Sequence, residues 1–159
     1  MIDILICNEM DAIPIAALYK ELMTEIIVKT VGDEQLVPKK DAAPLCRQLI
    51  SSGQYTVLKA VDLESAGIVG FLSMCESFSL YANGSYGVIQ ELYVREEFRS
   101  HGTGKSLIAF AVNFARSKDW KRLEVATPQL PEFERSLAFY EREGFLITGG
   151  CKLKLLLAN

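Results

Sequence analysis

The spacing of apolar and polar residues changes several times along the chain, and each change predicts a different element. The opening run MIDILIC is typical of a strand that ends at Cys7. Asp11 then occupies the N-cap position of a helix whose apolar residues recur at helical spacing as far as Leu22. Residues 23–40 have no clear periodicity, so we expect a long loop there with some irregular helix.

A second helix is predicted to start at Asp41, which can cap it. Leu45, Leu49 and Ile50 would form its apolar stripe, and the run SSGQ would end it.

Three strands follow. Residues 55–61 and 68–78 are rich in β-branched and aromatic residues, and the intervening DLESAG is typical of a hairpin turn. The third run, residues 85–94, comes directly after the turn dipeptide Asn83-Gly84. We expect these runs to form an antiparallel meander.

The second half of the chain alternates helices with strands. Residues 101–120 predict a helix with one apolar face, formed by Leu107, Phe110, Ala111, Phe114 and Ala115. A short strand is expected at residues 122–128, then an amphipathic helix over residues 131–144 that ends at Gly144. The segments 145–150 and 151–157 read as two closing strands. The order β-α-α-β-β-β-α-β-α-β-β is that of an α+β fold.

Length and composition narrow the class of protein. A chain of 159 residues can form one core and is too short for two ordinary domains, so we expect a single domain over residues 1–159. The formal net charge of -3 disfavours a nucleic-acid partner. No apolar run approaches the ~18 to 20 residues of a membrane span, and the N-terminus does not read as a signal peptide. We therefore expect a cytoplasmic protein that does not bind membranes.

Metal ligands are scarce in this sequence. Its four cysteines lie far apart without a CxxC pair, and His101 is the single histidine. We therefore expect reduced thiols and no metal site.

The stretch FRSHGTGKSLI, residues 98–108, ends in the Gly-Lys-Ser of a nucleotide-binding phosphate loop. That loop reads GxxxxGK[ST], and Arg99 stands where its first glycine should permit a sharp backbone turn. No following strand ends in the aspartate that would hold magnesium. Both departures disfavour an ATP site.

The same residues match R-x-x-G-x-G at Arg99, Gly102 and Gly104, between a strand and a helix. Such a turn leaves backbone N–H groups free at the positive end of the helix, where a pyrophosphate can accept them. Alternatively, the two glycines only make a tight connection.

Two segments, VIQELYVREEFRSHGTGKSLI and ERSLAFYEREGF, together resemble the GNAT superfamily of acyl-CoA-dependent N-acetyltransferases. The resemblance implies a central mixed, mostly antiparallel sheet of six to seven strands flanked by about four helices. It also implies acetyl-CoA as cosubstrate and, as acceptor, an amine of a small molecule or protein that attacks directly in a ternary complex. A non-catalytic acyl-CoA-binding module on the same fold is the alternative.

Carried over by position, the resemblance implies a set of cofactor-binding residues. Those at the pyrophosphate, mostly through backbone amides, would be Arg99, Ser100, His101, Gly102, Thr103, Gly104, Lys105 and Ser106. Those along the pantetheine arm would be Leu92, Tyr93 and Val94, where a β-bulge would splay the strand from RLEVA.

The resemblance also implies that Tyr140 is the general acid. A phenol of pKa about 10 can protonate a departing thiolate, whose thiol has a pKa of about 8.5. Alternatively, Tyr140 only extends the apolar stripe of Phe133 and Leu137. Glu91, the one carboxylate within its predicted strand, is the candidate base; the alternative is an exposed residue paired with a lysine. Cys75 lacks an adjacent base, which disfavours a ping-pong mechanism.

Three positions depart from the family pattern. Ser100 stands where glycine is frequent, Phe133 replaces an asparagine that usually begins the second motif, and Val88 lies where some relatives carry a carboxylate. The acceptor would be shaped by residues 23–41 and by ESFSLYANGS. A homodimer through the apolar run KLKLLL is a further hypothesis.

Overall fold

A five-stranded sheet forms the centre of the protein in a computed structural model that describes residues 1–158. The strands follow the order of the chain: β1 (Ile2–Ile6), β2 (Thr56–Asp62), β3 (Gly67–Ser79), β4 (Gly84–Val94) and β5 (Leu123–Val125). The first four are antiparallel to their neighbours, whereas β5 runs parallel to β4. The expected α+β class and the antiparallel meander are therefore confirmed.

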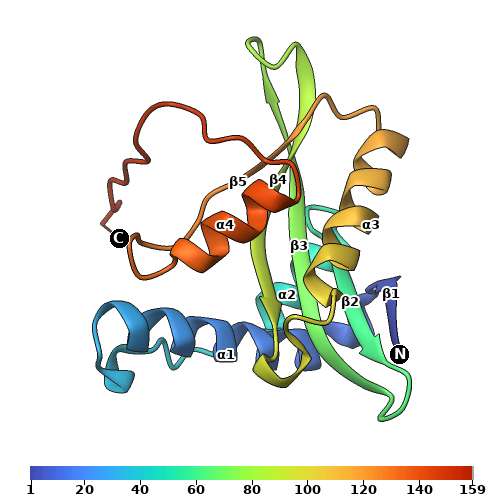
Figure 1. Ribbon diagram of the computed structural model, residues 1–159, viewed down its shortest axis with the longest axis vertical. Coiled ribbons are helices and arrows are strands. Elements are labelled where there is room, and N and C mark those ends of the chain that lie inside the picture. The colour runs from blue at the N-terminus through green and yellow to red at the C-terminus, as the bar shows by residue number, and fades with distance from the viewer. Residues whose placement is uncertain (159) are drawn as a thin grey trace.

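Helices cover both faces of this sheet (Figure 1). They are α1 (Ala12–Thr30), α2 (Ala43–Ser51), α3 (Thr103–Ser117) and α4 (Glu134–Arg142), with 3-10 turns η1 (Glu9–Asp11), η2 (Glu34–Leu36) and η3 (Glu96–Phe98). Alternate strand residues separate two cores: Val57 and Phe71 pack with α1 and α2, whereas Leu58 and Leu72 pack with α3 and α4.

The first helix is longer than its apolar pattern predicts. α1 continues through residues 23–30, which were expected to be loop, and ends where Gly32 adopts a φ of +80°. Glu25 and Lys29 lie among these residues and make ion pairs, and Glu21 makes another just before them. A helix held by charged contacts carries no apolar stripe, so periodicity alone could not detect it.

The second helix differs in one detail. Asp41 accepts the Ala43 N–H at 2.9 Å, in keeping with a role at its start. Leu45, however, is 56% exposed and does not belong to the expected stripe. Because α2 has only nine residues and packs chiefly on α1, its buried side is narrow.

The prediction of two closing strands is wrong. Residues 145–158 contain no strand, and in Figure 1 this segment leaves the sheet, which therefore has five strands instead of six to seven. Large apolar side chains along it are exposed, among them Leu146, Ile147, Leu153, Leu155, Leu156 and Leu157. An alternating pattern indicates a strand only where a neighbouring edge completes the hydrogen bonds, and three-residue β5 offers little edge.

Gly87 lies where β4 and β5 come together. A Cβ built there would be 2.5 Å from two ring carbons of Trp120 and 2.6 Å from Leu123 Cδ2. We expect Gly87→Ala to lower the free energy of unfolding by about 1 to 3 kcal/mol, because the ring must shift to admit the methyl group. Urea denaturation measures the change. Gly149→Ala is the control, since a Cβ there meets no atom within 4 Å; equal stability of the two variants would contradict the prediction.

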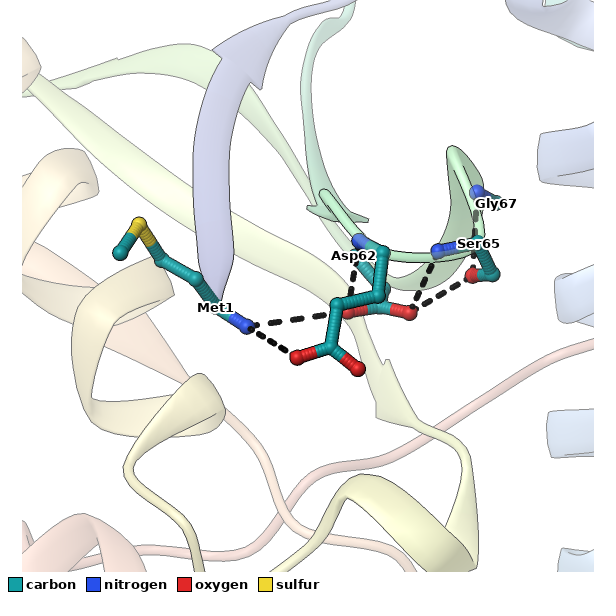
Figure 2. Close-up of polar contacts among 5 residues, drawn as sticks. Met1, Asp62, Ser65 and Gly67 are labelled. Atoms are coloured by element: carbon teal, nitrogen blue, oxygen red, sulfur yellow. Dashed lines mark hydrogen bonds and ion pairs between the residues drawn. The ribbon is translucent and has the colours of Figure 1, made fainter.

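Asp62 closes the turn between β2 and β3, as Figure 2 shows. Its Oδ2 accepts the Ser65 N–H at 3.0 Å and the Ser65 hydroxyl at 2.7 Å, and the Met1 ammonium lies 3.8 Å from Oδ1. The hydrogen bonds from Ser65 hold the pKa of the Asp62 carboxyl below its ordinary value. Ionised Asp62 is therefore favoured by the folded state.

This shift fixes a pH dependence for Asp62. Because its folded pKa lies below the unfolded value of about 3.9, its contribution is complete above that pH and is lost as the pH falls through the folded pKa. We expect Asp62→Asn to lower the melting temperature at pH 7 and to have a smaller effect at about pH 2, because the contribution of ionised Asp62 is lost as the pH falls through its folded pKa. Thermal unfolding at both pH values tests this. An equal loss at each would show that ionisation is irrelevant.

Candidate functional site

A β-bulge in β4 opens the sheet. Met74 pairs with Ile89 and Ser73 with Glu91, which leaves Gln90 as an extra residue on β4. Pairing between β4 and β5 is limited to Gly87–Ile89. Within residues 1–158 no strand pairs with the outer edge of residues 90–94, and we call this unpaired stretch the opening between β4 and β5. The resemblance implied a bulge at Leu92, Tyr93 and Val94; the structure has it just before them, at Gln90.

The turn before α3 presents a row of free amides. The Arg99 N–H is bonded to Glu96 O at 3.1 Å, and the Ser106 N–H to Gly102 O at 2.9 Å. The N–H groups of residues 100–105 have no acceptor within the described chain. Positive φ angles at Ser100 (62°) and Gly102 (85°) bend the backbone here. Such an array at a helix N-terminus binds anions.

The side chains of this turn point in different directions. Arg99 is directed toward α1, where it pairs with Glu25, and its Nε bonds Val94 O at 2.6 Å. Thr103 is buried on the face of α3 that carries Leu107, and its hydroxyl has no partner among the described residues. His101, Lys105 and Ser106 are exposed. The cation available beside the amides is therefore Lys105 and not Arg99.

Gly104 brings α4 next to this turn. A Cβ at position 104 would lie 3.2 Å from Phe139 Cζ, closer than most side-chain contacts. The absence of a side chain therefore lets the first turn of α3 approach the helix that carries Tyr140. The sequence indicated this glycine as a turn former; the structure adds its packing role.

Tyr140 belongs to the hydrophobic core, as one of the two sequence interpretations proposed. Its side chain is 8% exposed, and its ring makes edge contacts with Phe139 and Phe145 at centroid distances of 5.3 and 5.5 Å. Burial raises the pKa of Tyr140 to about 12. The hydroxyl is therefore protonated at physiological pH, which is the form of an acid, so the two interpretations are compatible.

Glu91 lies on the opposite face, toward α1 and α2. Its Oε2 accepts a short hydrogen bond from Ser73 Oγ, and the Tyr55 hydroxyl lies 3.4 Å from both carboxylate oxygens. The Glu91 N–H bonds Ser73 Oγ at 3.1 Å. No lysine or arginine of the described chain pairs with it. The alternative of an exposed residue paired with a lysine is therefore wrong.

Burial raises the pKa of Glu91, and the hydrogen bonds from Ser73 and Tyr55 oppose that rise. A carboxylate without a cationic partner can accept a proton from a bound amine. Tyr55 and Ser73 were not recognised from the sequence, because they are 36 and 18 residues away from Glu91. Cys75 touches the Gln90 amide at 3.3 Å, and no base of the described chain is bonded to it.

Across residues 1–158 there is no group of three or more histidine, cysteine, aspartate or glutamate side chains that could hold a metal ion. No helix in that part of the chain is both long enough and apolar enough to span a membrane.

Solved structures of acetyltransferases are similar to this chain. The GCN5-related N-acetyltransferase from Ralstonia eutropha JMP134 has a TM-score of 0.79 at 12% identity, covering 98% of this chain and 99% of its own. Ribosomal-protein-alanine N-acetyltransferase from Brucella melitensis biovar Abortus 2308 has a TM-score of 0.74 at 20% identity, covering 98% and 99%. An aminoglycoside acetyltransferase from an uncultured soil metagenomic sample has a TM-score of 0.71 at 20% identity, covering 99% and 97%.

Because the sequence identities to these structures are only 12% and 20%, the similarity shows the fold of this chain and no more. The model of the acetyltransferase (GNAT) family matches residues 19–145, most of the chain, including β4, the turn before α3 and α4. The chain therefore belongs to the acetyltransferase (GNAT) family and is an acyltransferase.

Proposed function

We propose that this acyltransferase moves an acetyl group from acetyl-CoA to a primary amine of a small molecule or protein, by direct attack in a ternary complex. The observation that carries the proposal is the opening between β4 and β5, bordered by the free edge of residues 90–94. The family uses acetyl-CoA as its cosubstrate. The similar structures include enzymes named for a small-molecule acceptor and for a protein acceptor.

The residues around the opening fit coenzyme A. The free amides of residues 100–105 suit its pyrophosphate, with Lys105 and Ser106 beside them. The unpaired edge of Leu92, Tyr93 and Val94 suits the amides of its pantetheine arm, because an extended chain with amides can bond a strand edge. When bound, the cosubstrate supplies the activated thioester.

Glu91 and Tyr140 would act from opposite sides of the sheet, and the opening is where those sides meet. At neutral pH, deprotonating an alkyl ammonium of pKa about 10.4 costs roughly 4 to 5 kcal/mol. We propose that Glu91, which has hydroxyl but no cationic partners, takes that proton. We propose that Tyr140 protonates the departing thiolate. Burial keeps its phenol protonated at neutral pH but, by raising the pKa to about 12, makes this transfer more uphill than it would be for an ordinary phenol.

The coenzyme is tested by thermal unfolding with acetyl-CoA, desulfo-CoA, or ATP with magnesium. A ligand at a hundred times its dissociation constant adds about 2.7 kcal/mol of stability, and we expect this from the two coenzyme A compounds. Stabilisation by ATP with magnesium alone would overturn the proposal. Binding of coenzyme A without turnover of any amine would favour the non-catalytic module.

We expect Tyr140→Phe to lower kcat by about 100-fold or more, because loss of a general acid costs about 10² to 10⁴ in rate. The dissociation constant of coenzyme A should change little, since the ring and its packing remain. Steady-state kinetics and calorimetry give the two values. Tyr86→Phe is the control, because Tyr86 is also a buried tyrosine, 9% exposed, and lies at the end of β4 that is far from residues 90–94. Equal kcat in both variants would exclude Tyr140 as the acid.

The base is tested through its hydrogen bonds. Because the bond from Ser73 lowers the pKa of Glu91, Ser73→Ala should raise that pKa and move the acidic limb of the kcat/KM profile to higher pH. NMR titration of the Glu91 carboxyl carbon measures the same shift without turnover. A raised carboxyl pKa with an unmoved acidic limb would show that Glu91 is not the base.

A further inference from the structure

Two matched ion pairs connect α1 with the end of β4 and the turn that follows it. Arg95 Nη2 lies 2.9 Å from Glu21 Oε1, and Arg99 Nη1 and Nη2 lie 3.0 and 2.6 Å from the two oxygens of Glu25. Glu21 and Glu25 are one helical turn apart. Figure 1 shows α1 crossing the end of the sheet where β4 stops.

Several contacts hold the guanidinium group of Arg99. Besides the two bonds to Glu25, its Nε donates to Val94 O at 2.6 Å, and its Cζ lies 5.3 Å from the centroid of the Tyr93 ring. Its backbone N–H is bonded to Glu96 O. A bidentate pair with a carboxylate fixes the plane of a guanidinium group as well as its position. Arg99 is therefore a fixed point at the start of the turn.

The next residue needs such a fixed point. Ser100 has a φ of 62°, a conformation that L-residues other than asparagine and aspartate rarely adopt. Strained backbone persists where surrounding contacts determine it. If Ser100 relaxed, the N–H groups of the following residues would no longer converge on one anion.

Glu25 also connects with the other helix of the site. Lys29 Nζ lies 3.3 Å from Glu25 Oε1 and 5.0 Å from the centroid of the Phe133 ring, directly before α4. Burial alone would raise the pKa of Glu25, but the bonds and charges of Arg99 and Lys29 outweigh it and lower the pKa. One ionised carboxylate thus joins α1 to the turn before α3 and to the start of α4.

We propose that Glu25 is a positioning residue for coenzyme binding: by fixing Arg99, it keeps Ser100 in its left-handed conformation and the amides of residues 100–105 in an array that fits a pyrophosphate. The inference rests on the proposed function, because it concerns the same coenzyme site. It assigns the Arg99 side chain to this anchor and not to the phosphates.

The test is the dissociation constant of desulfo-CoA, measured by calorimetry on the whole chain. We expect Glu25→Gln to raise it about tenfold, which corresponds to a competent turn populated about a tenth of the time. Glu21→Gln removes a similar charged pair from the same helix and should stay within about twofold of the native protein. Adding Ser100→Gly to Glu25→Gln should restore most of the affinity, because glycine adopts a positive φ without strain.

Each outcome supports or overturns the inference about Glu25. Equal affinity of Glu25→Gln and Glu21→Gln overturns the inference, as does tighter binding by Glu25→Gln, which would mean that a released Arg99 binds phosphate. Failure of Ser100→Gly to restore affinity overturns it as well. If Glu25→Gln does not fold, Glu25→Asp keeps the charge, loses the bidentate geometry and is judged by the same criteria. A native protein that does not bind desulfo-CoA would overturn the proposed function instead.

Discussion

The pairing of β4 with β5 stops after Ile89, and the arrangement of the whole site depends on that limit. Before this point, the missing side chain of Gly87 leaves room for Trp120 and for Leu123 of β5, which both lie close to it. After it, the extra residue Gln90 turns β4 away from its neighbour. Beyond Ile89 the outer edge of β4 has no strand partner. The proposed roles of Glu91 and Tyr140, which lie on opposite faces of the sheet, depend on a substrate bound along this edge.

In the proposed coenzyme site, backbone dipoles would take the place of a basic surface. The chain is acidic overall, and one of the few cations near the start of α3, Arg99, is neutralised by Glu25. The free amides of residues 100–105 carry partial positive charge without a side chain that could seek another partner. An anion can thus be bound by an acidic protein, provided that the backbone is held in shape.

The sequence predicted those parts of the structure that depend on neighbouring residues. The alternation in the meander, the turn at Asn83-Gly84 and the apolar face of α3 are local, and all three are present. Residues 23–30 of α1 were not predicted as helix, because the contacts that hold them include the pair of Glu25 with Arg99, which lies 74 positions away. The prediction of the closing strands failed for a related reason. Alternating apolar and polar residues are typical of a strand, but they do not show that a neighbouring strand is there to pair with it. The position of Glu91 on a strand could be predicted from the sequence, but its contacts with the Tyr55 and Ser73 hydroxyls could not.

Under the proposed function, Tyr140 would fill two roles that are separated by a single atom. Its ring belongs to the core with Phe139 and Phe145, so a small or polar residue at this position would destabilise the fold whatever the chemistry. Only the oxygen bears on proton transfer. Among descendants of such a chain, loss of catalysis would therefore leave phenylalanine behind more readily than any other residue. At this position the fold requires the ring, and under the proposed function only the reaction requires the hydroxyl.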